Sequence, residues 1–157
     1  MRDIIKLLQG NRQYKEIISH VLTRKDCSVH GLWGSSANFF VATLAHERQK
    51  RPERRPKMLL VVSHIEEAQD DFEDLNTFLH GYVSLFPAGE NISVKYGKDE
   101  DDILSQRTCI LRQILHKDSD SGNEPYVIVT PIQALLPPVP APQSISENSI
   151  YIQRNQE

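Results

Sequence analysis

The sequence has little of what marks a disulfide-rich, metal-binding or membrane protein. Its two cysteines, Cys27 and Cys109, stand far apart, which excludes both a disulfide framework and a zinc motif of paired cysteines. We expect each to be a small buried hydrophobe in a reducing compartment. No apolar stretch is long enough to span a bilayer, and the N-terminus lacks the apolar core of a signal peptide. We therefore expect a cytoplasmic protein without membrane contact.

An excess of positive charge is also missing. The net charge is -3, with 18 Lys and Arg against 21 Asp and Glu, which does not favour nucleic-acid binding by the chain as a whole. The basic loop 48–57 is compatible with contact to a DNA backbone, but a solvated linker is the favoured interpretation because the loop lacks aromatic residues. The acidic cluster 99–102 is interpreted as favourable charge at a helix start rather than as a metal site.

Apolar residues follow strand and helix patterns in turn along the 157 residues, which suffice for one domain with a core. Helical spacing is expected before the first apolar run and after each one. Continuous apolar runs are typical of parallel strands covered on both faces. The runs that predict strands are 29–33, 58–62, 82–86 and 126–129. This alternation predicts a three-layer α/β domain with a mostly parallel sheet.

Capping signals mark two of the expected helix starts. Ser63 and Glu66 have the spacing of a capping box, in which each side chain bonds the other residue's backbone N–H. At the second start, Thr130 is the expected cap, Pro131 fits the first helical position and Gln133 would complete the box. The apolar spacing after Ser63 predicts a helix with one buried face.

The glycine turn between the first expected strand and helix has the context of a phosphate-binding loop. Gly31, Gly34 and Ser35 are placed to cradle a phosphate with backbone N–H groups beside the helix N-terminus. Ala37, however, replaces the lysine that reaches the phosphates, and Asn38 replaces the Ser/Thr that binds magnesium. We therefore predict a degenerate phosphate loop, with no catalytic residue, metal ligand or cofactor, in a chain that is not an enzyme.

Several segments share their order and spacing with one known family. They are HGLWGSSA (30–37), LLVV (59–62), EEA (66–68), DFEDL (71–75), LFPAGE (85–90), QR (106–107) and VIVTPIQALL (127–136). Together they resemble the N-terminal region of bacterial transcription-repair coupling factor (Mfd), which is itself similar to the first domain of the excision-repair protein UvrB. The resemblance covers about residues 27–140. One departure is Gly89, where the family usually has tryptophan.

The resemblance implies a helicase-like, P-loop-NTPase-like α/β domain that has lost ATP hydrolysis. In the family this region scaffolds recruitment of UvrA and the nucleotide excision repair machinery to RNA polymerase stalled at DNA damage. UvrA is therefore the implied partner, and its docking surface is expected beyond Glu157. RNA polymerase and DNA would be contacted by motor domains further downstream.

The resemblance also divides the chain. It places N-terminal helices in 1–26, an incomplete UvrB-like α/β domain in 27–136, and a proline-rich linker in 137–157 that leads towards a UvrA-interaction subdomain. The family strand that completes the first domain is missing, so we expect an open sheet edge with uncovered apolar surface. Two alternatives remain: a UvrB-type or helicase-type nucleotide-binding domain with residual ATP affinity, and an adaptor that uses 137–142 as a peptide ligand.

Overall fold

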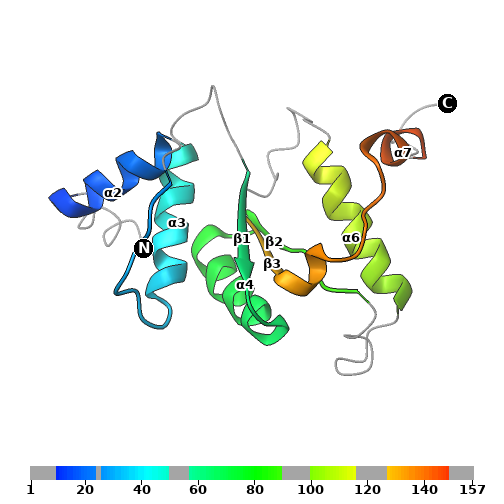
Figure 1. Ribbon diagram of the computed structural model, residues 1–157, viewed down its shortest axis with the longest axis horizontal. Helices are drawn as coiled ribbons and strands as arrows, with labels where there is room; N and C mark the ends of the chain where they lie inside the picture. The colour runs from blue at the N-terminus through cyan, green and yellow to red at the C-terminus, as the bar shows by residue number, and fades with distance from the viewer. Residues whose placement is uncertain (1–9, 24–25, 50–56, 90–99, 116–126, 149–157) are drawn as a thin grey trace.

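The computed structural model describes residues 10–23, 26–49, 57–89, 100–115 and 127–148 (Figure 1). Helices and strands alternate between residues 36 and 131, as the sequence predicts, but no described strand separates the first two helices. The elements are α2 (Arg12–Leu22), α3 (Ser36–Gln49), β1 (Met58–Val62), α4 (Ile65–Leu79), β2 (Val83–Leu85), α6 (Glu100–Leu115), β3 (Val127–Pro131), the 3-10 helix η1 (Ile132–Leu135) and α7 (Pro142–Glu147). The sequence predicts a helix over about 36–49 after the glycine turn, and these bounds and those predicted for β1 are confirmed.

A parallel sheet of three strands forms the centre of the described chain. The strand order is β1-β3-β2, so the last strand in sequence lies between the first two. Val127 of β3 is level with Met58 on one side and Val83 on the other. Parallel neighbours need crossover connections, and the helices between these strands supply them. The predicted α/β class and the parallel sheet are confirmed.

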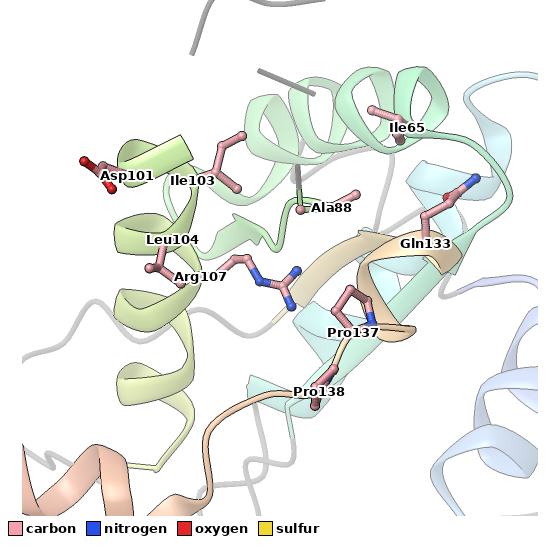
Figure 2. Close-up of a pocket in the computed structure, with 10 residues that line it drawn as sticks. Ile65, Ala88, Asp101, Ile103, Leu104, Arg107, Gln133, Pro137 and Pro138 are labelled. Carbon is pink, nitrogen blue, oxygen red and sulfur yellow. The ribbon is translucent and has the colours of Figure 1, made fainter. Parts of the chain in front are cut away.

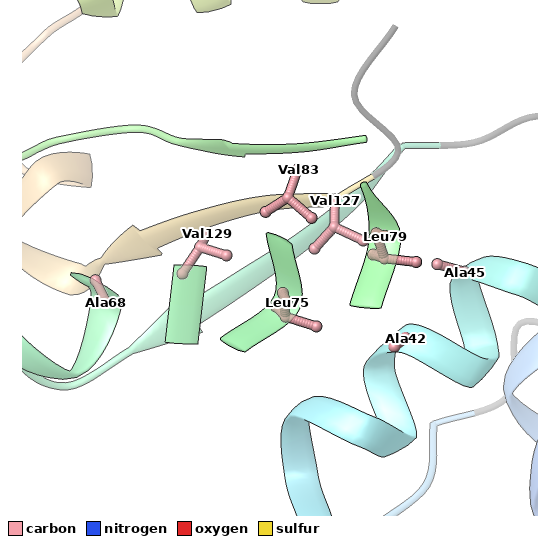
Figure 3. Packing of buried hydrophobic residues seen from close by; sticks show 8 residues of the cluster. All are labelled: Ala42, Ala45, Ala68, Leu75, Leu79, Val83, Val127 and Val129. Carbon is pink, nitrogen blue, oxygen red and sulfur yellow. The ribbon is translucent and has the colours of Figure 1, made fainter. Parts of the chain in front are cut away.

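Successive residues of β3 face opposite sides of the sheet, and helices lie on both sides. Val127 and Val129 pack with α3 and α4, where Leu75 and Ala42 belong to the same buried cluster (Figure 3). Ile128 belongs to a second cluster, which includes Ile103 and Ile110 of α6 and Phe86 after β2. Every residue of β3 is buried. The central strand is therefore covered on both faces, as its continuous apolar sequence predicts.

Strand β1 is covered on one face only, which differs from the prediction. Leu59 and Val61 are exposed, while Leu60 and Val62 pack on the α3 and α4 side. Leu59 is level with Ile128 of β3, so its side chain lies on the α6 face of the sheet. Helix α6 packs against the residues around β3 and β2 instead of β1. Two apolar side chains of this strand are therefore exposed on the α6 face of the sheet.

Helix α2 packs against α3 beside the sheet. Tyr14 and Ile18 form a small buried cluster with Leu44. Asn11 caps the helix, and its side-chain oxygen accepts a hydrogen bond of 3.2 Å from the backbone N–H of Tyr14. The predicted break near residues 10 and 11 is confirmed, because a new helix starts directly after this cap. The earlier apolar positions 4, 7 and 8 lie outside the described residues.

Both predicted capping boxes are wrong in detail. Helix α4 begins after His64, and the Ser63 backbone N–H is bonded by Glu67 at 3.1 Å rather than by Glu66. Thr130 does not cap a helix, because it lies inside β3 and its hydroxyl donates to the Phe86 carbonyl at 3.1 Å. The turn that follows is a short 3-10 helix whose N-cap is Pro131. Strand β3 continues through Thr130 to Pro131, so the residue that the local sequence pattern selects as a helix cap is part of the sheet.

The proline-rich segment contains a helix that the sequence analysis missed. Helix α7 begins at Pro142, whose fixed φ suits the first helical turn. Ile145 is buried, and α7 lies beside α6 (Figure 1). Residues 137–141 have no regular secondary structure, which fits the extended segment predicted there. The strand proposed for 150–153 lies outside the described residues.

Candidate functional site

The structure places no strand before the glycine turn. Residues 26–33 have no regular secondary structure, so the strand predicted at 29–33 is wrong. None of the described strands pairs with this run, and Gly31 and Gly34 adopt positive φ angles of 84° and 54° that turn the chain sharply. Trp33, which the apolar run seemed to bury, is 84% exposed. In a phosphate loop the glycine turn directly follows a buried strand. Residues 26–33 form no such strand.

The turn is closed by its own hydrogen bonds. The backbone N–H of Trp33 donates to the Ser36 hydroxyl at 2.7 Å, and the N–H of Ser36 donates to the Trp33 carbonyl at 3.2 Å. The N–H of Phe39 donates to the Ser35 carbonyl at 3.0 Å, within the first turn of α3. A phosphate cradle needs N–H groups that point at the ligand. Those of Trp33 and Ser36 are already used inside the turn.

Asn38 joins α3 to α4. It is 5% exposed, and its side-chain Nδ2 donates to Asp71 Oδ1 at 2.7 Å and to Asp74 Oδ2 at 3.3 Å. Both carboxylates belong to α4, which packs beside α3. In an active phosphate loop this position presents a hydroxyl to magnesium. Here the amide is committed to a bond between two helices, and Ala37 beside it is exposed and carries no charge.

The surroundings of Asp71 disfavour the charged form of its carboxyl group. Partial burial raises the pKa of its carboxyl, and the negative charges of Glu67, Asp74 and Asp70 raise it further. The hydrogen bond from Asn38 acts in the opposite direction and lowers it. The amide of Asn38 therefore offsets part of the repulsion on the acidic face of α4. Anionic phosphate would add to this repulsion.

A buried cation lies on the other side of the sheet. Arg107 of α6 is 8% exposed, and its guanidinium carbon lies 4.2 Å from the centre of the Phe86 ring. Its Nη1 donates to the Pro87 carbonyl at 2.6 Å, while Nη1 and Nη2 both donate to the Ala134 carbonyl at 3.3 Å. Burial lowers the pKa of Arg107, which nevertheless stays charged at neutral pH. No carboxylate of the described residues pairs with it.

Arg107 lines a cavity of about 530 Å³ between α6 and the segment after η1 (Figure 2). The walls are mostly apolar, and the polar side chains are those of Arg107, Gln133 and Asp101. Gln133 donates through Nε2 to the Ser63 carbonyl at 3.1 Å, but its Oε1 is buried without a hydrogen-bond partner among the described residues. The sequence analysis did not select Arg107 as a site. Its spacing with Ile103 and Ile110 on the apolar face of α6 was the available signal.

The remaining sequence-based predictions have mixed outcomes. Cys27 and Cys109 are both exposed, so the expectation of buried cysteines is wrong; neither belongs to a buried cluster of the described core. Helix α6 starts at Glu100, so residues 100–102 of the acidic cluster lie in its first turn as predicted, while residue 99 lies outside the described residues. The basic stretch at 50–56 lies outside the described residues. Within the described ranges, no group of three or more His, Cys, Asp or Glu is placed to hold a metal ion.

Comparisons of this chain with protein-family models, with curated proteins and with solved structures find no match. Among the described residues, no helix has both the length and the apolar character needed to cross a membrane.

Proposed function

We propose that this chain is a non-catalytic scaffold module of a transcription-repair coupling factor. Its role would be to scaffold recruitment of the UvrA-containing nucleotide excision repair machinery to stalled RNA polymerase, as its resemblance to the Mfd N-terminal region implies. The observation that carries the non-catalytic part is the commitment of Asn38 to Asp71 and Asp74. A helicase-like fold with a decayed phosphate loop is part of the same proposal.

The surroundings of the turn support a structural role over catalysis. Phosphoryl transfer needs a cation on the transferred phosphate and a metal held by a hydroxyl and a carboxylate. Ala37 and Asn38 supply neither, and the nearest described carboxylates to Asn38 are engaged by its amide. The ends of β1 and β3 are followed by Ser63 and formed by Pro131, neither of which is acidic. Helix α3 follows the glycine turn as in a phosphate loop, but the described residues do not supply the cation and metal ligands that phosphoryl transfer needs.

Apolar side chains on the surface support a role in contacts with other domains or proteins. Leu59 and Val61 are exposed side by side on the edge strand β1, and Trp33 is exposed on the turn before α3. Exposed apolar groups of this size are typical of interaction surfaces. Trp is also the residue most often found at the energetic centre of an interface. A scaffold needs such surfaces, whereas a self-contained enzyme does not.

A pull-down tests the recruitment part of the proposal. Because the docking surface is expected beyond Glu157, the natural gene product that contains this sequence is immobilised through a terminal tag and incubated with purified UvrA, with an unrelated protein of similar charge on matched beads. Enrichment of UvrA over the control supports the proposal. Equal recovery from both kinds of bead would refute recruitment through this protein.

The competing function is nucleotide binding with residual ATP affinity. The positive φ angles of Gly31 and Gly34 favour it, because they show a tight glycine turn directly before a helix. Calorimetric titration with Mg-ATP separates the two. We expect no saturable heat. A saturable isotherm that disappears after Gly34→Val would instead show that the turn binds nucleotide, and the scaffold proposal would lose its main support.

A further inference from the structure

The unused edge of Arg107 suggests a ligand for the cavity. The observed hydrogen bonds use both hydrogens of Nη1 and one hydrogen of Nη2. An arginine carries further N–H groups on Nε and on the second position of Nη2. These two point in the same direction, because the Nε hydrogen and Nη2 lie on the same edge of the planar guanidinium. Neither has an acceptor among the described residues.

This pair of parallel N–H groups has the geometry that binds a carboxylate through both oxygens. The two carbonyl acceptors and the Phe86 ring fix the guanidinium plane, so the fork is held in place before a ligand arrives. Carbonyl dipoles and an aromatic face compensate a buried cation only in part. An entering carboxylate would supply the missing counter-charge. Figure 2 shows Arg107 extending from α6 towards the segment that carries Pro137 and Pro138.

Gln133 adds a second requirement on the ligand. Its Oε1 accepts no hydrogen bond from any described residue, while its Nε2 donates to the Ser63 carbonyl. An occupant that donates an N–H as well as presenting a carboxylate would satisfy both polar groups of the cavity. The remaining walls, including Ile65, Ile103 and Leu104, are apolar. A volume of about 530 Å³ is within the usual range for ligand pockets.

The charge of the cavity favours one negative charge over two. Arg107 is the only cation among the described lining residues, and Asp101 contributes a carboxylate at the same cavity. A phosphate dianion is normally bound by several basic groups, and the carboxylate of Asp101 would repel it. A peptide with one acidic side chain matches these groups: its carboxylate pairs with the guanidinium of Arg107, and a backbone N–H donates to the amide oxygen of Gln133. Its apolar atoms contact the apolar walls.

We propose that this cavity binds an acidic peptide segment of a partner protein, with an Asp or Glu side chain on the outer fork of Arg107 and a backbone N–H near Gln133 Oε1. This inference is independent of the identity proposed above. The site concerns α6, the end of β2 and η1, and it does not involve the glycine turn.

The test is an NMR titration with small probes. N-acetyl-glutamate N-methylamide carries the carboxylate and the amide N–H, and N-acetyl-glutamine N-methylamide is its neutral counterpart. We expect saturable shifts of the Arg107 Nε–Hε and Gln133 side-chain amide signals by the acidic probe, with a dissociation constant on the order of 1 mM, as for a fragment. The neutral probe should bind at least about tenfold more weakly.

Two variants at Leu104 keep the result interpretable. Leu104 is 62% exposed and lines the cavity without a role in holding Arg107. Leu104→Glu adds a like charge and should weaken the acidic probe by about tenfold or more, whereas Leu104→Gln, of equal size, should change it by about threefold at most. Arg107→Lys should abolish two-point binding, but it can also unfold the site. The Leu104 pair avoids this ambiguity.

Three results would overturn the proposal. The first is equal affinity for the acidic and neutral probes, and the second is the absence of any saturable shift of the two reporter signals. The third is binding of glutarate, which has no amide N–H, as tightly as the acidic peptide probe. That last result would assign the cavity to a free carboxylic acid instead of a peptide.

Discussion

The side-chain Nδ2 of Asn38 donates a hydrogen bond of 2.7 Å to a carboxylate oxygen of Asp71. Asn38 can be interpreted in two ways, one from the sequence and one from the structure. In sequence, Asn38 is the residue that replaces a magnesium ligand. In the structure, it is the donor that holds α3 against the acidic face of α4. The residue that supports the proposed absence of catalysis therefore has a structural role of its own.

Replacing Asn38 should destabilise the domain. Asn38→Ala removes a buried donor to two carboxylates and should lower the free energy of unfolding by about 1–3 kcal/mol. Asn38→Asp, of equal size, should cost more near neutral pH because it adds a third carboxylate at the same place. Urea unfolding measures both. Ser35→Ala, at an exposed position of the same turn, is the control and should change stability by about 0.5 kcal/mol at most.

Asp71 should make stability fall as pH rises. Its pKa in the folded chain lies above the ordinary 3.8, so the folded state binds the proton more tightly than the unfolded state does. Stability from this group is therefore greatest below 3.8 and is lost as pH rises through the raised value. Asp71→Asn should remove this component while its amide oxygen still accepts from Asn38. Unfolding curves at several pH values above 3.8 compare the two.

A variant whose stability follows the same pH profile as the natural chain would contradict this account. The comparison uses the difference between the two curves, because other carboxylates on α4 titrate in the same range. Asp101→Asn, on a different helix, provides a second reference for the general effect of one fewer negative charge.

The elements that were predicted correctly are those whose signal is local. Helix α3 and strand β1 are recognised from an apolar run with charged or proline-rich flanks, and α4 from the spacing of Ala68, Leu75 and Leu79. These patterns depend on which side chains must be buried along a single element. The parallel sheet also follows from the alternation of such elements.

The elements that were missed depend on partners far away in the sequence. The run at 29–33 has strand-like composition, but no strand of the described ranges pairs with it, and it is irregular. Thr130 has the local features of a helix cap, yet the Phe86 carbonyl, 44 residues away, takes its hydroxyl. The proline-rich sequence around Pro142 predicts extended chain, but Pro142 is the first residue of α7. This helix is stabilised by the burial of Ile145.

The candidate sites divide in the same way. The sequence alone shows Ala37 and Asn38 at the positions where a phosphate loop would have lysine and a hydroxyl. The partner of Asn38 is 33 residues away in Asp71, and no local rule identifies it. Arg107 looks like any helical arginine until the chain places it against Phe86 and Ala134. A cation on an apolar helix face is the only sequence signal of that cavity.

Thr130 should contribute through its hydroxyl. Thr130→Val keeps the volume and removes the bond to the Phe86 carbonyl, which should lower the free energy of unfolding by about 1–2 kcal/mol. The same change at exposed Thr108, whose hydroxyl bonds the carbonyl of Leu104 within α6, is the matched control. It should change stability by about 0.5 kcal/mol at most. Equal losses at the two sites would mean that the bond to Phe86 adds nothing.

Leu75 should be the most sensitive position of the larger core. It is fully buried in the cluster that joins α4 to β3 and α3, so Leu75→Ala removes buried apolar volume where the surrounding helices and sheet can close in only partly. Such changes cost about 2–5 kcal/mol, and guanidinium or urea unfolding measures the loss directly. Leu136→Ala, at an exposed leucine after η1, is the control and should cost about 0.5 kcal/mol at most. A small effect at Leu75 would mean that α4 does not pack on the sheet as described. The contact between Asn38 of α3 and Asp71 of α4 would then be in doubt too, because it depends on the same packing.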